Sequence, residues 1–583
     1  MTAAYPDSNV LAGSPPLARR KLDSETLYEK LFRNGVVVIL AVVVLAPVLL
    51  IAYQSVLDGP FFHKNAHLGF AAYRFVLSDP DFFAALRTTA VFSAGMVLIA
   101  VPLGAVLAFL MTRSDVGLKG ALEILILTPM FLSSLILAFG YVVSIGPQGF
   151  LTIAWRSVFG EEFWNIYSLA GMTIVAGLSH VPHVYLYVAA AMRNLPWELE
   201  EAAQTCGAGP WRVALDVTLP LVAPAFVFAI VLNVLLGFEI FGIPLILGDS
   251  QGITVLTTYI YKLSTMMGTP SYEAMAVVAS FLMVMTLPMV WLQRRLLRRS
   301  QRFVVVGGKG GRSGSLRLGT RGRLVATAII VAWLLVSVIL PVSGIVVRAF
   351  VSAWGAGTDL WQQVSLQSFR DVLAMPALVR GIVNTLLLSV IGGAIAVAAY
   401  LMIGLASHRH RGRSAAVLDY LVLLPRALPG IVVGLAFLWV FLFVPFLAPM
   451  RGTLLSLLLA YMVVGLSYGL RIIQSSLLQV SPDLEEAARV AGATVGRAWR
   501  DVLVPIIRPG LAGAFVLIMI VFIRENSTGL YLMGSGTEVV GTLIITLSQS
   551  GDLNPGAVLA LLNIIMIVAA LTLALRLGAR IRD

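Results

Sequence analysis

The sequence predicts an all-helical integral membrane protein made of two tandem six-helix halves. Hydrophobic residues make up 59% of the 583 positions and charged residues only 12%, a composition too apolar for a water-soluble protein. Apolar segments of about 20 residues, the length that a helix needs to cross hydrocarbon, recur along the chain. A polar loop sequence also occurs twice, with its residues displaced by a constant number of positions. Together these observations define the fold class.

Twelve spans are expected, six in each half. Strands of a membrane barrel would be half as long and alternating, so helices are favoured. The second half re-enters with the orientation of the first, which predicts a parallel repeat with the translocation path on a pseudo-twofold axis. The approximate limits are 35–55, 88–111, 121–145, 168–192, 221–247 and 274–293, then 324–348, 384–406, 415–444, 453–478, 510–533 and 555–577.

The basic residues divide the chain and orient it. A polar tail (1–34) precedes the first six-span domain (35–293), and a basic linker (294–323) joins it to the second (324–583). The linker carries many arginines and no acid, so it and both termini are expected on the cytoplasmic side. The net charge of +12 therefore reflects membrane orientation rather than nucleic-acid binding. Cys206 is the only cysteine, which excludes an internal disulfide framework and a cysteine-based metal cluster.

The duplicated loop reads ELEEAAQTCGAGPWRVALDVTLP up to Pro220 and DLEEAARVAGATVGRAWRDVLVP up to Pro505. Within it every matched position is displaced by 285 residues. Further matches at a displacement of 296 join Thr89 to Thr385 and Pro129 to Pro425. The difference predicts about 11 extra residues in the first half, between its third and fourth spans. The matched residues are Glu201, Ala202, Ala203 and Gly207 in the first copy and Glu486, Ala487, Ala488 and Gly492 in the second.

The residue types of the duplicated loop suit docking. Pro196 and Pro482 stand where a membrane helix ends and a short surface helix begins, since proline fits a first helical turn. Acidic residues follow in that turn, where they suit the helix dipole. Gly207 and Gly492 are expected to take positive φ and reverse the chain. The alanine pairs leave a helix face small enough to enter a groove on another protein. The competing interpretation is a simple connection between spans.

The motif resembles the EAA signature of permease subunits of bacterial ATP-binding cassette (ABC) importers. The resemblance implies the type I importer permease fold in the bacterial inner membrane. It implies that Glu201, Ala202, Ala203 and Gly207, and likewise Glu486, Ala487, Ala488 and Gly492, form two surfaces that dock cytosolic ATPase subunits. Two copies of one ATPase and a periplasmic substrate-binding protein are the implied partners.

The chain carries no recognisable enzyme motif. In GGKGG, Lys309 is followed by glycine rather than serine or threonine, so a phosphate-binding loop is not expected. ATP is expected to be hydrolysed by the partner. We expect no cofactor and no bound metal.

A few ionisable residues within spans are candidates for the translocation path. Insertion of such a group costs roughly 2.5–3.5 kcal/mol, so it usually faces a bundle interior or a wet cavity. Glu239 and Glu525 occupy nearly corresponding places in the two halves, Arg524 precedes Glu525, and Arg426 replaces the first half's Met130. Structural ion pairs, helix-end positions and snorkelling remain competing interpretations. His180 and His183 share one helix face and are expected to pack structurally.

The fused halves, FEIFGIPLILG and RENSTGLYL are most similar to the ferric-iron branch of these permeases. Transport of 2-aminoethylphosphonate, thiamine or polyamine by the same machinery is the alternative. A secondary transporter of the major facilitator type, also built as six plus six spans, is the rival class. That class does not explain the two EAA loops.

Overall fold

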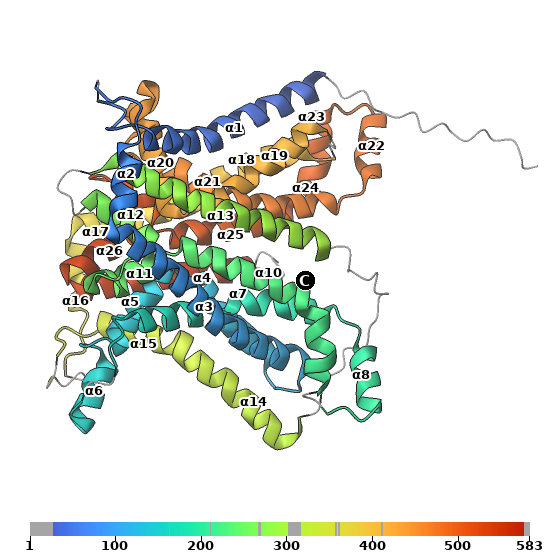
Figure 1. Cartoon of the computed structure of the whole chain (residues 1–583). Coiled ribbons are helices and arrows are strands. Elements are labelled where there is room, and N and C mark those ends of the chain that lie inside the picture. Colours follow the sequence, from blue (N-terminus) through green and yellow to red (C-terminus); the bar gives the residue numbers. More distant parts are fainter. Residues whose placement is uncertain are drawn as a thin grey trace, which may run out of the picture.

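The structure is a computed structural model dominated by helices (Figure 1). Among the described residues only three isolated β-bridges occur, and no strand. The described ranges are 27–63, 65–161, 164–209, 212–265, 270–300, 316, 318–355, 358, 362–409 and 412–576. Most of the predicted tail (1–34) and much of the basic linker (294–323), including Lys309, lie outside these ranges.

The first half is a run of membrane-length helices with short helices at both ends. Its chain order is α1 (Leu27–Ser55), α2 (Ala71–Ser78), α3 (Pro80–Arg113), α4 (Lys119–Phe131), α5 (Ser134–Ile145), α6 (Phe150–Phe159), α7 (Leu169–Arg193), α8 (Trp197–Thr205), η1 (Val213–Thr218), α10 (Leu219–Glu239), α11 (Gly242–Leu247), η2 (Asp249–Gln251), α12 (Leu256–Thr265) and α13 (Tyr272–Ser300).

The second half repeats this order with more local breaks. It comprises α14 (Gly319–Leu334), η4 (Leu335–Ile339), α15 (Leu340–Ala349), α16 (Gln367–Ala374), α17 (Pro376–Leu387), η5 (Leu388–Gly392), α18 (Gly393–Ser407), α19 (Arg413–Leu423), η6 (Leu424–Ala427), α20 (Gly430–Phe443), η7 (Pro445–Met450), α21 (Leu454–Leu478), α22 (Pro482–Val490), α23 (Val495–Ala498), η8 (Trp499–Leu503), α24 (Val504–Ile506), α25 (Arg508–Arg524), η9 (Thr528–Tyr531), α26 (Val540–Ser550) and α27 (Leu553–Arg576).

The predicted fold class is confirmed. Ten described helices are long and apolar enough to cross a membrane, and two bent pairs raise the number to as many as twelve. The duplication extends to hydrogen bonds. Thr89 Oγ1 accepts from the backbone N–H of Leu256 at 2.9 Å, and Thr385 Oγ1 accepts from that of Val540 at 2.9 Å. The extra residues of the first half form α6, where the second half has only η7.

Four of the expected spans are interrupted. The expected span 121–145 breaks between α4 and α5, where Ser133 Oγ caps the new helix by accepting from Ile136 N. The span 415–444 bends by 110° between η6 and α20, because Pro425 and Pro429 cannot donate to a continuous helix. The helices α10 and α25 end at Glu239 and Arg524, earlier than the limits expected for the fifth and eleventh spans.

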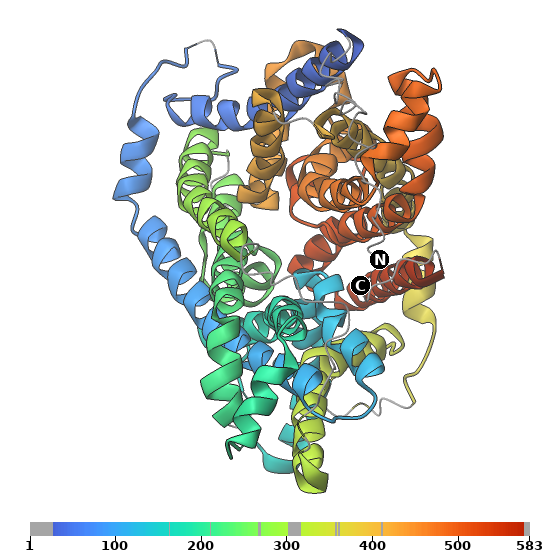
Figure 2. The same cartoon turned by 90° about the vertical axis from the view of Figure 1, so that its right-hand side faces the viewer.

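The first helix of each half packs on the other half. Figure 2 shows α1 (dark blue) beside the orange helices of the second half, where it contacts α18, α19 and α20. The α14–α15 segment (yellow-green) lies against the first half, and α15 makes extensive contact with α5. The Ser144 hydroxyl of α5 donates to Leu340 O at 2.8 Å across this contact. The two halves are therefore held together by exchanged helices.

Candidate functional site: two surface loops and a central cavity

The first EAA loop forms a short helix at one end of the bundle. Figure 1 shows α8 standing apart from the membrane-length helices. Within it Glu201 and Ala202 are exposed and Ala203 is half-buried. Gly207 follows with φ of 87°. Its N–H donates to Gln204 O at 2.8 Å, and the N–H of Ala208 donates to Ala203 O at 3.0 Å. The helix therefore ends in a chain reversal that requires glycine.

The second EAA loop repeats this geometry. The α22 helix lies at the same end of the bundle (Figure 1) and begins at Pro482. Glu486 and Ala487 are exposed, and Ala488 is half-buried. Gly492 has φ of 90°, its N–H donates to Arg489 O at 3.0 Å, and Ala493 N donates to Ala488 O at 3.0 Å. The surface helices and positive-φ glycines predicted from the sequence are thus present in both loops.

Each loop helix is also tied to the end of its half's second span, which sequence reasoning missed. Arg113 Nε lies 3.0 Å from Glu200 Oε1, and this carboxylate also accepts from the Thr218 hydroxyl at 2.8 Å. In the second half Arg409 lies 2.8 Å from Glu485. The arginines differ by 296 positions and the glutamates by 285, which are the two displacements of the sequence repeat. Aligning the two halves could therefore have shown that both residues of the pair recur.

The second ion pair has a histidine beside it. His408 Nε2 lies 3.7 Å from the carboxylate of Glu485. Burial, together with the charge of Arg409, lowers the pKa of His408 to about 4. The imidazole is therefore neutral at pH 7, and Arg409 is the charged partner of Glu485.

A second candidate site lies where helix breaks of both halves meet. The breaks after α4, α10, η6 and α25 line one cavity of about 200 Å³. Irregular backbone at membrane depth is tolerated where it lines a cavity. All four residues predicted from the sequence as pathway candidates border it, namely Glu239, Arg426, Arg524 and Glu525. The structure thus brings together residues that are far apart in the sequence.

The cavity charges differ in how well they are satisfied. Arg524 Nη1 donates to Met130 O at 2.6 Å, a contact between the two halves. Glu525 Oε1 accepts from the backbone N–H and the hydroxyl of both Ser527 and Thr528 at 2.9–3.1 Å, so it caps η9. Arg426 Nε and Glu239 Oε1 have no hydrogen-bond partner among the described residues. Glu525 is therefore already engaged, whereas Arg426 and Glu239 keep bonding capacity.

The histidine pair was expected to pack structurally, but both rings border the same cavity. Their centroids are 5.2 Å apart in a stacked arrangement. His180 Nδ1 lies 2.8 Å from Ala176 O, and His183 Nδ1 has no hydrogen-bond partner in the part of the chain that the structure describes. Within the described ranges no group of three or more potential metal ligands occurs, here or elsewhere.

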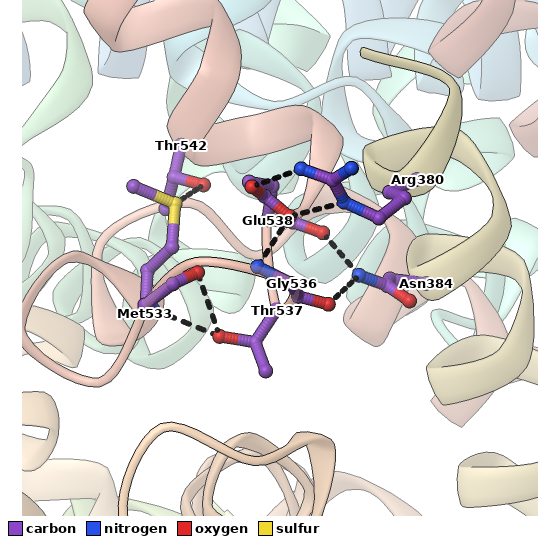
Figure 3. Close-up of polar contacts among 8 residues, drawn as sticks. Arg380, Asn384, Met533, Gly536, Thr537, Glu538 and Thr542 are labelled. Atoms are coloured by element: carbon purple, nitrogen blue, oxygen red, sulfur yellow. Dashed lines mark hydrogen bonds and ion pairs between the residues drawn. The ribbon is translucent and has the colours of Figure 1, made fainter. Parts of the chain in front are cut away.

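At the opposite end of the bundle a polar clamp holds the segment before α26 (Figure 3). Arg380 Nη2 lies 2.9 Å from Glu538 Oε1, and Asn384 Nδ2 donates to Gly536 O and Glu538 O. The hydrogen bond from Arg380 lowers the pKa of Glu538 to about 2. The matching first-half positions hold alanine and threonine, Ala84 and Thr88, so this clamp belongs to the second half alone.

Comparison with known proteins decides the family. The model for "Binding-protein-dependent transport system inner membrane component" matches residues 100–302 and again 400–583. The chain belongs to this family. It is a two-domain ABC importer permease, and the second match falls in the second half, as the duplication predicts. Membership decides against the major facilitator interpretation.

Two of the relatives are named as ferric transport permeases, one of them as putative. The chain is 22% identical to the ferric transport system permease protein FbpB of Actinobacillus pleuropneumoniae, over 76% of this chain and 63% of that protein. It therefore matches less than two thirds of that relative's length. It is 26% identical to the probable ABC transporter permease y4fN of Sinorhizobium fredii, over 67% and 69%. The molybdenum permease ModB of Escherichia coli is 31% identical over 27% of this chain and 67% of its own.

Among solved structures, a bacterial alginate ABC transporter in complex with a periplasmic protein bound to alginate pentasaccharide is similar. The match has 21% identity and a TM-score of 0.36, and covers 40% of this chain and 84% of the other.

Proposed function

We propose that this chain forms the translocation path of an ATP-driven importer and couples that path to cytosolic ATPase subunits through α8 and α22. The observation that carries the proposal is the repeated loop geometry. Each loop presents an exposed glutamate and alanine on a short helix that ends at a positive-φ glycine, Gly207 or Gly492. Small side chains on an exposed helix suit insertion into a groove of a partner.

Two copies of one ATPase are the proposed partners, because the two loops share their backbone geometry. The docking residues would be Glu201, Ala202, Ala203 and Gly207 on one side and their counterparts displaced by 285 on the other. The membrane-spanning helices imply an inner-membrane location. We place both termini on the cytoplasmic side, together with the basic linker. The functional halves would be 35–293 and 324–583.

The two ion pairs offer a route by which motion of a docked ATPase reaches the spans. Glu200 joins α8 to Arg113 at the end of α3, and Glu485 joins α22 to Arg409 after α18. A displacement of either loop helix would therefore pull on the second span of its half. Because α1 and α15 pack across the halves, such a pull would rock one half against the other around the cavity.

Ferric iron is the substrate that we propose, since two relatives, which match 76% and 78% of this chain, are named as a ferric and a putative ferric transport permease. Glu239, Arg426, Arg524 and Glu525 would border the path. Because a molybdenum permease is also among the relatives, other substrates remain alternatives. These include 2-aminoethylphosphonate, thiamine and polyamine. A periplasmic binding protein would deliver the substrate to the face opposite α8 and α22.

Co-purification tests the partner proposal. The full chain would be expressed with an ABC-type ATPase from its own genome, and the complex weighed by native mass spectrometry. We expect one permease chain with two ATPase copies. If the chain formed a complex with none of these ATPases, the proposal would be contradicted.

A further inference from the structure

The central cavity is electrically polarised between the two halves. The cationic side chains Arg426 and Arg524 both come from the second half, from η6 and the end of α25. The second half also contributes Glu525, whereas the first half contributes Glu239 at the end of α10 and the two histidines. Since α10 and α25 are equivalent helices ending 285 positions apart, Glu239 and Arg524 are structural counterparts of opposite charge. The cavity therefore has one cationic wall.

The cationic wall lacks a full set of protein partners. Arg426 makes no ion pair within 4 Å in the described part of the chain, and its Nε has no hydrogen bond. Its guanidinium lies 5.7 Å from the ring centroid of Tyr468, which supports the charge without neutralising it. Arg524 uses one of its Nη atoms to donate a hydrogen bond to Met130 O. A charged group at this depth is costly and ordinarily marks a ligand path.

The acidic residues of the cavity do not compensate this wall equally. Glu525 Oε1 is held by four donors of the η9 turn. Glu239 Oε1 has no hydrogen-bond partner among the described residues, and none of the ion pairs between those residues joins Glu239 to Arg426. Nor do the side chains around the cavity form a set of three metal ligands in the described residues. A bare trivalent cation would thus meet two arginines and, among the described residues, no set of three metal ligands.

We infer that the cavity binds an anionic oxygen group, such as a carboxylate or phosphate, between Arg426 and Arg524. A guanidinium presents paired donors that match such a group. This inference rests on the proposed importer function and deepens it: ferric iron would cross as an anionic chelate rather than as a naked cation. A free organic or inorganic anion offers the same chemistry, and the experiment separates the two sources.

The test is calorimetric titration of the full chain in nanodiscs of neutral lipid. Three probes are used: inorganic phosphate, ferric citrate, and hexaamminecobalt(III) as a trivalent cation that carries no anion. The chain supplies its own control substitution, because Met130 occupies the position equivalent to Arg426. Arg426→Met should weaken anion binding about 10- to 100-fold, since charge-assisted hydrogen bonds are lost. Arg426→Lys, which keeps the charge but not the paired donors, should weaken it less.

The variant Glu239→Gln keeps the shape of this side chain but cannot carry a negative charge, so it should bind the anion at least as tightly as the unsubstituted chain does. Binding of ferric citrate alone would identify a chelate as cargo, and binding of phosphate as well would identify a free anion. The inference is overturned if hexaamminecobalt(III) binds instead and Glu239→Gln weakens it, or if no probe binds the folded chain. The titration needs no ATPase, so its failure is distinguishable from a failure of ATP-driven uptake.

Discussion

Arg113 and Glu200 form an ion pair at 3.0 Å in which neither side chain is more than 6% exposed. The equivalent pair, Arg409 and Glu485, is 29% and 16% exposed. Removing one partner of a buried pair leaves an uncompensated charge, at a cost of about 3–5 kcal/mol. Arg113→Gln should therefore lower the thermal unfolding temperature in detergent more than Arg409→Gln does. Equal shifts in the two variants would show that burial does not distinguish the pairs.

The positive-φ glycines should be needed for coupling rather than for folding of the bundle. A Cβ at Gly207 or Gly492 would meet no atom of the described residues within 4 Å, so the cost of a side chain there is backbone strain. That strain is about 1–2 kcal/mol, and it is worst for β-branched residues. Gly492→Val should reduce transport per ATP hydrolysed, whereas Gly492→Asn, which tolerates this backbone region, should retain more. The check is parallel measurement of ATPase activity and uptake. If a variant with both Gly207→Val and Gly492→Val transported as much substrate per ATP hydrolysed as the unsubstituted chain, the docking account would be contradicted.

The two threonines that repeat across the halves should contribute alike to stability. Thr89→Val or Thr385→Val leaves the buried N–H of Leu256 or Val540 without its acceptor, which costs about 1–3 kcal/mol. Serine at either position keeps the hydroxyl and should recover most of the loss. Thermal unfolding of the four variants measures this. A neutral result for both valine variants would argue against the shared hydrogen bond.

The clamp at Glu538 should loosen in acid. Its pKa in the folded chain is about 2, below the ordinary value of 4.5, so the carboxylate stabilises the clamp above pH 4.5. That contribution falls as the pH drops from 4.5 towards 2 and the group takes up a proton. The protection factors of the amides in residues 532–539, which are exchange rates corrected for the pH dependence of an unstructured chain, should fall over this interval, and Glu538→Gln should show low protection throughout. Protection factors that do not change with pH in the unsubstituted chain would refute the clamp.

Much of the architecture could be predicted because the governing signals are local and repeated. Apolar length gave the spans, and the displacement of the EAA loops gave the two surface helices and their glycines. The helix breaks were missed, because Ser133 and Glu239 sit within runs as apolar as any continuous span. The Arg113–Glu200 pair was also missed, since one residue closes a span and the other opens a loop, and only the fold brings them together.

The residues of the cavity could be predicted from the sequence, but their roles could not. Glu239, Arg426, Arg524 and Glu525 were found from the cost of burying charge. Their individual roles were not, because Glu525 is occupied by Ser527 and Thr528 through a turn that the sequence does not reveal. The register that matches Glu239 with Arg524 likewise needed the observed helix ends.

The most direct test of the central claim is uptake by proteoliposomes that contain this chain, its ATPase and the binding protein, with ATP inside or outside and the proton gradient set separately. We expect uptake only when ATP is on the side of α8 and α22, and no uptake without the ATPase. Uptake driven by a proton gradient alone, in the absence of any ATPase, would contradict the account.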